Sequence, residues 1–239
     1  MRRVMMSIVA LAAFATPDAM KAQDEVEVAL STDVVSSYIW RGQDLGGAAV
    51  QPTLGLSYKG LSFGAWGSYG IDARNETKEL DLTLSYSVGG FTVGITDYYC
   101  TAGMESTPGK YFGYAAHSTG HVFEANLGYD FGCMSVNWYT NFAGSDYFKS
   151  DGGRAYSSYV ELAAPFKLGG LDWDATLGFI PYETGFYADA TGFAVTNISV
   201  KATKELNITP SFKLPVFAGL TANPSTEKLY FMAGFTLGI

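Results

Sequence analysis

Two histidines, His117 and His121, carry the most versatile chemistry in this chain. They lie in "AAHSTGHVF", where a serine directly follows His117. A hydrolase needs a histidine that is held against a nucleophile and oriented by a third group, and adjacency in the sequence does not supply that geometry. A separation of four residues suits metal binding on a helix, but this segment has no helical pattern. We therefore expect no catalytic site, no metal site and no cofactor, and interpret both histidines as loop or rim residues.

The segment "SSYIWRGQDLGG", residues 36–47, places two large aromatic side chains and a fixed positive charge beside a glycine-rich turn. Such a cluster could form a binding site, or it could be the end of a β-strand. In a strand, alternation sends Tyr38 and Trp40 to one face and Arg41 to the other. Gly42 can adopt backbone conformations that other residues avoid, so the chain can leave the strand there. The elements that hold the segment decide between these interpretations.

The N-terminus has the layout of a secretory signal peptide. Arg2 and Arg3 precede an apolar stretch at 4–15, and a polar segment follows. The apolar stretch is too short for a membrane-spanning helix, which needs about 20 residues. We expect cleavage near Ala22, which gives a signal peptide at 1–22 and one exported domain at 23–239. Cleavage removes three of the 15 basic and one of the 23 acidic residues and leaves 12 against 22, a balance that disfavours nucleic acid as a partner.

Apolar and polar residues alternate along most of the chain. In "LDWDATLGF", Leu171, Trp173 and Phe179 fall on one face, and Asp172 and Asp174 on the other. This period of two indicates strands that are apolar on one side and polar on the other. The expected strands lie at 26–41, 49–59, 61–71, 78–88, 91–101, 121–131, 133–143, 155–167, 171–181, 193–203, 208–217 and 227–238.

The connections between these strands alternate in length. Tight links such as "VGGF" and "KLGGL" alternate with longer polar links such as "GSDYFKSDGGR" and "GLTANPSTE". All short turns then lie at one end of the molecule and all long loops at the other. A soluble β-sandwich has the same period and is the alternative, but strands of about 10 residues tilted by about 40° match the ~25 Å apolar height of an outer-membrane barrel. We expect an all-β fold, a closed up-and-down antiparallel transmembrane β-barrel of about 12 strands with short periplasmic turns and longer extracellular loops.

The chain end and the cysteines agree with a barrel. In "EKLYFMAGFTLGI", Gly234, Leu237 and Ile239 resemble the C-terminal signal read by the barrel-assembly machinery, although an aromatic is commoner in the last position. An even strand count lets the last strand pair with the first, so that no edge stays open in lipid. Cys100 and Cys133 are expected at opposite ends of the barrel, too far apart for a disulfide, which needs Cα atoms within about 7 Å.

Strand parity separates lipid-facing from lumen-facing side chains. The aromatic residues expected outside are Tyr38, Trp40, Tyr69, Tyr99, Phe142 and Phe179 near the loops, and Tyr58, Phe63, Phe91, Tyr129, Phe131, Phe166 and Trp173 near the turns. The charged residues expected to line the lumen are Asp33, Arg41, Glu79, Asp81, Glu124, Glu161, Asp172, Asp174, Lys201 and Lys213. Arg41 is expected at the lumen rim, paired with Asp72 or Gln51. Asp97 falls on the outward parity, and Pro210 and Pro215 interrupt one strand, so irregularities are expected there.

An acidic lumen predicts which solutes the barrel would pass. Twelve strands lie between barrels filled by side chains and barrels with an open channel, and a surplus of carboxylates favours cations and neutral solutes. We expect a narrow outer-membrane porin for small solutes, with lipid and the assembly machinery as partners and no enzymatic activity. Two alternatives stay open: the lumen charges pair and only stiffen the barrel, or a non-conducting barrel displays its tyrosine-rich loops at 102–120, 144–154 and 182–192 to a partner.

Three segments at the start of the mature chain form a motif. "SSYIWRGQDLGGAAVQPTLGLSY" is followed by "GLSFGAWGSYGID" and "KELDLTLSY". Their pattern resembles that of the TorF-type porins, a conserved outer-membrane family of unknown function. The residues that carry the resemblance are Tyr38, Trp40, Arg41, Gly42, Pro52 and Trp66. The resemblance covers about the first quarter of the chain. It implies an exported outer-membrane barrel with porin activity, and it implies neither a substrate nor site residues.

Overall fold

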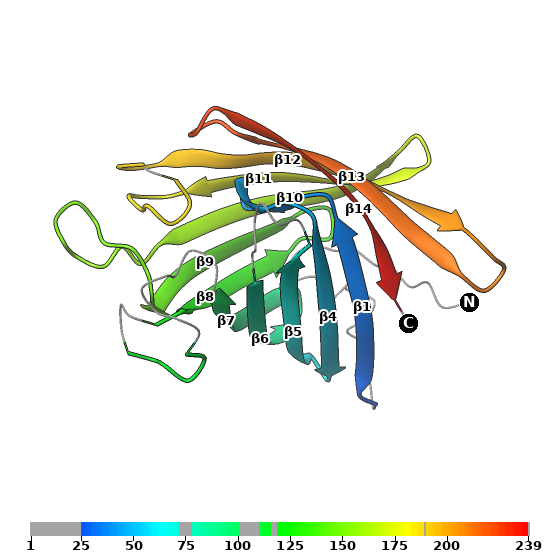
Figure 1. Ribbon diagram of the computed structural model, residues 1–239, viewed down its shortest axis with the longest axis horizontal. Helices are drawn as coiled ribbons and strands as arrows, with labels where there is room; N and C mark the ends of the chain where they lie inside the picture. Colours follow the sequence, from blue (N-terminus) through cyan, green and yellow to red (C-terminus); the bar gives the residue numbers. More distant parts are fainter. Residues whose placement is uncertain (1–24, 72–77, 101–109, 116–118, 189, 239) are drawn as a thin grey trace.

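A closed antiparallel β-barrel of twelve strands makes up the fold (Figure 1). This computed structural model describes residues 25–71, 78–100, 110–115, 119–188 and 190–238. The expected signal peptide, Asp72, His117 and Ile239 lie outside the described residues. The barrel strands are β1 (Glu27–Val35), β4 (Ala49–Tyr58), β5 (Leu61–Gly70), β6 (Lys78–Val88), β7 (Phe91–Cys100), β8 (His121–Asp130), β9 (Ser135–Gly144), β10 (Ser158–Leu168), β11 (Leu171–Ile180), β12 (Ala194–Asn207), β13 (Lys213–Asn223) and β14 (Lys228–Gly238).

The sheet closes because β1 pairs with β4 on one side and with β14 on the other. This confirms the predicted all-β barrel and its strand count. In the part of the chain that the structure describes, no helix is long and apolar enough to cross a membrane.

Alternation along each strand gives the barrel two different faces. In β4, Leu54, Leu56 and Tyr58 are exposed on the outer wall, while Gln51 and Gly55 are buried toward the lumen. The exposed outer aromatics include Tyr58, Phe63, Tyr69, Phe91, Phe131, Phe142 and Phe166. The predicted parity is therefore confirmed for these residues.

Short turns join the strands at one end. Lys59 and Gly60 connect β4 to β5. The same two-residue link joins β6 to β7 through Gly89 and Gly90, and β10 to β11 through Gly169 and Gly170. Each of these residues has a positive φ, which matches the right-handed twist of the flanking strands. One predicted long loop, "GLTANPSTE", is wrong: β13 continues to Asn223, and only 224–227 connect it to β14. The strand predicted at 208–217 starts later, because 208–212 with Pro210 form the preceding turn.

The largest correction concerns the strand predicted at 26–41. The strand β1 ends at Val35, and β2 (Tyr38–Trp40) and β3 (Gln43–Gly46) form a separate two-stranded hairpin. Val35 and Ala49 are the last pair between β1 and β4, so residues 36–48, here called the lumen hairpin, are inserted at the loop end. The chain reverses at Arg41 and Gly42, whose φ angles are 47° and 81°.

At the turn end, β10 to β13 extend beyond their neighbours. The strand β9 stops pairing at Ser135, so residues 164–168 of β10 pair only with β11. The strand β14 leaves β13 after Val216, so residues 213–215 pair only with β12. Figure 1 shows β14 running toward β1 while β12 and β13 continue away from it. The four strands therefore form a protruding sheet with two free edges.

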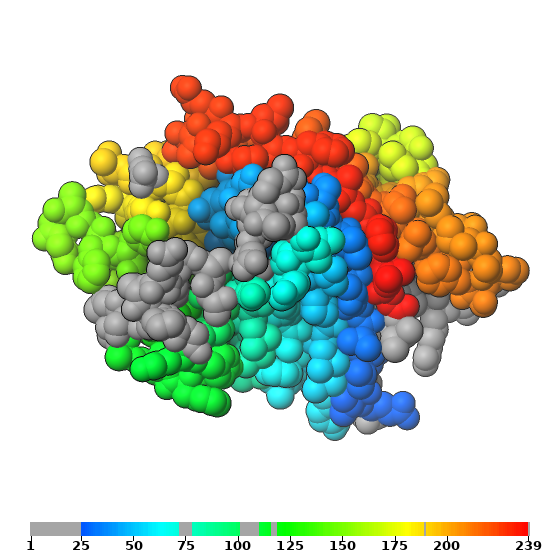
Figure 2. All heavy atoms as spheres, in the orientation of Figure 1, coloured from blue at the N-terminus to red at the C-terminus, as the bar shows by residue number. Residues whose placement is uncertain are grey.

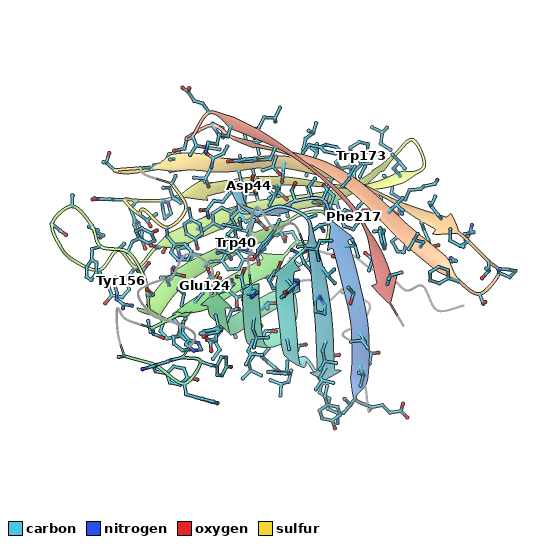
Figure 3. All side chains as sticks on the ribbon, viewed as in Figure 1. Trp40, Asp44, Glu124, Tyr156, Trp173 and Phe217 are labelled. Atoms are coloured by element: carbon cyan, nitrogen blue, oxygen red, sulfur yellow. The ribbon has the colours of Figure 1, made fainter. Side chains whose placement is uncertain are left out.

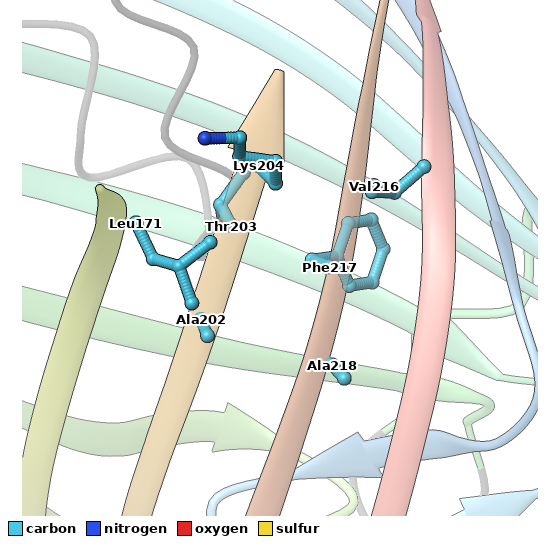
Figure 4. A pocket seen from close by; sticks show the side chains of 7 residues that line it. All are labelled: Leu171, Ala202, Thr203, Lys204, Val216, Phe217 and Ala218. Carbon is cyan, nitrogen blue, oxygen red and sulfur yellow. The ribbon is translucent and has the colours of Figure 1, made fainter. Parts of the chain in front are cut away.

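Each free edge of this extension contains a proline. Pro165 lies in the unpaired part of β10 and Pro215 in that of β13. Proline has no backbone N–H to donate, so both edges resist pairing with a further strand. Small side chains at Ala202 and Ala218 leave a shallow groove of about 230 Å³ between β11, β12 and β13 (Figure 4).

Candidate functional site: the hairpin-filled lumen

The lumen hairpin crosses the barrel interior near the loop end. The ring of Tyr38 lies 5.4 Å from that of Trp66 on β5, and the ring of Trp40 lies 5.8 Å from that of Tyr98 on β7. On the opposite side, the Asn223 amide at the end of β13 donates a 2.9 Å hydrogen bond to the Gly42 carbonyl. In Figure 2, atoms in the blue of the N-terminal segment are visible between the yellow and the red segments. The hairpin thus contacts walls on different sides of the lumen.

Arg41 lies at the centre of these contacts. Its guanidinium donates from Nη1 to Glu124 Oε2 at 2.5 Å and from Nη2 to Glu124 Oε1 at 3.0 Å. Nη1 also donates to the Tyr187 hydroxyl at 2.8 Å. Trp40 and Glu124, the two residues that contact Arg41 from the hairpin and from β8, are labelled in Figure 3. The two-point pairing of guanidinium and carboxylate is among the strongest polar contacts available to a protein.

Aromatic rings surround the Arg41 guanidinium. Its Cζ lies 3.9 Å from the ring centroid of Tyr139, 4.5 Å from that of Trp40, 4.9 Å from that of Tyr159 and 5.6 Å from that of Tyr187. At these distances the ring faces attract a cation, and the attraction grows when water is excluded. We call Glu124, Tyr139, Tyr159 and Tyr187 the guanidinium cage.

Hydroxyl groups saturate the Glu124 carboxylate. Tyr98 donates to Oε1 at 2.9 Å and Tyr187 to Oε2 at 3.1 Å. Burial raises the pKa of Tyr187 well above its ordinary value, so its hydroxyl keeps its proton and can donate. Burial, the largest single cause, lowers the pKa of Arg41, but Glu124 together with Tyr187 and Tyr98 outweighs it, and the pKa of Arg41 lies well above its ordinary value. The guanidinium therefore stays charged.

The backbone at the hairpin tip is held in a conformation that side chains rarely adopt. A non-glycine residue with positive φ, such as Arg41, is uncommon. At Gly42, a Cβ atom would overlap the carbonyl oxygen of Thr196 on β12. The contacts of the Arg41 side chain offset the conformational free energy that its positive φ costs. Gly42 lets the hairpin backbone approach the wall closely because it has no Cβ.

Carboxylates dominate the inner wall around the hairpin. Glu79 and Asp81 face the lumen from β6, and the Tyr38 hydroxyl hydrogen-bonds to Glu79. Asp33 on β1 and Glu161 on β10 also face inward, with Tyr159 donating to Glu161 at 3.1 Å. Lys201 lies 3.9 Å from Asp174 lower in the barrel. Four acidic side chains of the inner wall thus lie around the hairpin.

Two of the predicted lumen residues lie outside the enclosed part of the barrel. Asp172 pairs with Lys167, and Lys213 pairs with Glu205, all on the extension at the turn end. The Asp172 and Lys167 side chains are 65% and 75% exposed. These side chains contact solvent and each other rather than the other lumen charges.

The predicted positions of Tyr38 and Trp40 in the outer girdle are wrong. Both lie inside the barrel, because the chain leaves the wall after Val35 and folds inward instead of continuing as a strand. Arg41 faces the lumen as predicted, but its partner is Glu124, while Gln51 donates to Ser68. The conformation at Arg41 and Gly42 makes a turn, so the alternation assumed for a strand does not apply.

The tyrosines of the cage were missed from the sequence. Tyr139 and Tyr159 have the inward parity of their strands, and Glu161 two residues along from Tyr159 was recognised as inward. Large aromatics on the inner face of two paired strands were the signal for a filled lumen. Tyr187 lies in the connection between β11 and β12, where no parity applies.

A second polar pair lies on the outer wall. His121 Nδ1 is 2.7 Å from Asp97 Oδ1, and its Nε2 is 2.6 Å from the Tyr111 carbonyl oxygen. Rings of Tyr99, Tyr114 and Phe123 pack around the imidazole. His121 is the first residue of β8, at the loop-end rim where it was predicted, and its side chain is fully buried there. The pairing explains how Asp97 is accommodated on the outward parity.

In the described residues, the histidine and the cysteines form neither a metal site nor a disulfide. In that part of the chain, no group of three or more His, Cys, Asp or Glu side chains could hold a metal ion. Cys100 lies at the loop end of β7 and Cys133 in the turn after β8, at opposite ends of the barrel, and no disulfide joins them. The lumen hairpin and its cage are therefore the candidate site.

No family model and no curated protein matches this chain. Among solved structures, the chain is similar to one described as "Unveiling the Mechanism Behind the in-meso Crystallization of Membrane Proteins", with a TM-score of 0.48 and 4% identity. The alignment covers 89% of this chain and 83% of that one. This degree of likeness identifies no family.

Proposed function

We propose that this chain is an outer-membrane barrel that conducts small cations and neutral solutes, and that the lumen hairpin closes it in the conformation described. The observation that carries the proposal is the independence of the wall from the hairpin. Val35 and Ala49 already pair across β1 and β4, so the barrel closes without residues 36–48. An insertion that closes the lumen but is not needed for the wall is suited to control passage.

The outer surface supports placement in a membrane. Aliphatic and aromatic side chains cover the outward face of most strands, among them Leu84, Ile95, Leu127, Leu220 and Phe231. A continuous apolar wall of this kind is unfavourable in water and favourable in a bilayer, where a closed sheet leaves no backbone group unpaired. Export through the predicted signal peptide and the resemblance to TorF-type porins agree with the outer membrane, and both remain predictions.

The inner wall supports a preference for cations. Glu79 and Asp81 project from one strand, and Asp33 projects from another. Carboxylates in a confined low-dielectric space raise the local concentration of cations and exclude anions. A solute that passes the hairpin therefore meets a wall rich in carboxyl groups.

A second function is favoured by the burial of the hairpin contacts. The side chains of Arg41 and Glu124 are 5% and 2% exposed, so the lumen is filled at their level. A barrel that never opens would serve as a structural protein or display its loops to a partner.

Planar-bilayer recording separates these functions. Purified protein is expected to give discrete conductance steps with a reversal potential that indicates cation preference in a salt gradient. The double variant Glu79→Gln, Asp81→Asn should lose much of that preference, because the wall loses two carboxylates. Asp172→Asn is the matched control and should leave the preference unchanged, since Asp172 lies on the exposed extension. Silent bilayers for the wild type and for a variant without the hairpin would favour the non-conducting barrel.

A further inference from the structure

The guanidinium cage is built from the barrel and not from the hairpin that fills it. Glu124 belongs to β8, Tyr139 to β9 and Tyr159 to β10, and Tyr187 belongs to the connection before β12. The hairpin supplies Arg41 and one further ring, that of Trp40. When the hairpin moves, Glu124, Tyr139 and Tyr159 stay with the wall, and Tyr187 stays with the connection between β11 and β12. We infer that the cage is a binding site for guanidinium-bearing solutes and that Arg41 occupies it in the closed conformation.

The geometry selects a guanidinium group over other cations. Two nitrogens of Arg41 meet the two oxygens of Glu124, an arrangement that a planar guanidinium makes and a point-like ammonium or alkali ion does not. The flat group also lies close to the Tyr139 ring, 3.9 Å from its centroid. A free guanidinium solute can reproduce both contacts.

Burial makes an empty cage unfavourable. Glu124 is 2% exposed, and the rings around it exclude water. If Arg41 leaves and nothing replaces it, a buried carboxylate loses its counter-ion, which is strongly destabilising. A solute that fills the cage removes this cost and so shifts the equilibrium toward the displaced hairpin. This inference deepens the proposed function and rests on it for its role in transport, because it names the solute class that the channel would admit.

The backbone conformation of Arg41 allows the cage to be emptied by a single substitution that adds no strain. Its φ of 47° favours glycine, so Arg41→Gly removes the guanidinium without straining the hairpin turn. The variant leaves a cavity that is bounded by Glu124 and the tyrosines and has the shape of the lost group. Arg154→Gly is the matched control, because Arg154 is a loop arginine whose guanidinium donates to the Gly144 carbonyl and approaches the Tyr156 ring.

The test is chemical rescue by guanidinium chloride at millimolar concentration. Purified protein in detergent is heated, and folded and unfolded forms are separated by their gel migration. Guanidinium should raise the unfolding temperature of Arg41→Gly in a saturable way, by about 3 to 6 °C at about tenfold excess over Kd. It should not raise that of the wild type or of Arg154→Gly. Equal rescue by sodium or tetramethylammonium chloride, or no rescue of the folded variant, would overturn the site.

A measurement on the wild type covers the case in which Arg41→Gly does not fold. Hydrogen exchange of the backbone amides at 36–48 should become faster with millimolar guanidinium chloride and not with sodium chloride at equal ionic strength. Unchanged exchange would overturn the competition between solute and Arg41. Neither readout needs conductance. Rescue by guanidinium together with silent bilayers would refute the channel and keep the site. Conductance with neither rescue nor faster hydrogen exchange would refute the site alone.

Discussion

Two ion pairs with the same charges lie in opposite environments in this barrel. Arg41 and Glu124 meet inside the lumen with side chains 5% and 2% exposed, whereas Lys167 and Asp172 meet at the turn end with side chains 75% and 65% exposed. The first pair is surrounded by tyrosine rings and hydroxyls. In the second pair, each charged group can exchange its partner for water at little cost in free energy. Burial, rather than the pairing of opposite charges, therefore determines which pair organises the structure.

The largest expected effect comes from breaking the buried pair. Glu124→Gln keeps the size of the side chain but leaves the Arg41 guanidinium in the lumen without a counter-charge. Loss of one partner of a buried pair costs about 3–5 kcal/mol, so the free energy of unfolding should fall by that amount or the hairpin should leave the lumen. Urea titration in detergent, followed by the gel migration of the folded barrel, measures the change. A loss below about 1 kcal/mol would place this pair with the surface pairs.

A medium effect is expected at the tip of the hairpin. Gly42→Ala adds a methyl group that overlaps the Thr196 carbonyl and forces a positive φ on alanine, which should cost about 1–3 kcal/mol. Gly152→Ala is the matched control, because Gly152 has a φ of 82° but no atom within 4 Å of the added Cβ. The same titration should show a smaller loss for Gly152→Ala. Equal losses would mean that the close contact between hairpin and wall contributes nothing.

The smallest effect is expected at the exposed pair. Asp172→Asn removes a charge that solvent already screens, so the free energy of unfolding should change by less than about 1 kcal/mol. The change should shrink further in high salt. A loss as large as that of Glu124→Gln would remove the contrast between the two ends of the barrel.

The wall was readable from the sequence because it depends on local rules. Alternation in β11, with Leu171 and Trp173 opposite Asp172 and Asp174, follows from a sheet that separates an apolar from a polar environment. Turn residues such as Gly89 and Gly90 mark hairpins by their conformational freedom. Each of these signals lies within a few residues of the feature that it predicts.

The inward fold of residues 36–48 was not readable from the sequence because it depends on distant contacts. Residues 38–41 alternate as a strand would, and the turn at Arg41 and Gly42 is stabilised by Glu124 and Tyr187, which lie 83 and 146 positions along the chain from Arg41. Strand parity correctly placed Glu124 in the lumen but could not show which cation it meets. The candidate site was thus predicted in its separate residues and not in their arrangement.

Conductance of a barrel without its hairpin tests the central claim most directly. Replacing residues 36–48 by Asn-Gly joins Val35 to Ala49, which already pair, through a two-residue turn suited to a β-hairpin. If the hairpin closes a membrane channel, this variant should conduct in planar bilayers with larger and longer openings than the wild type. A folded variant that inserts into the bilayer and stays as silent as the wild type would contradict the account.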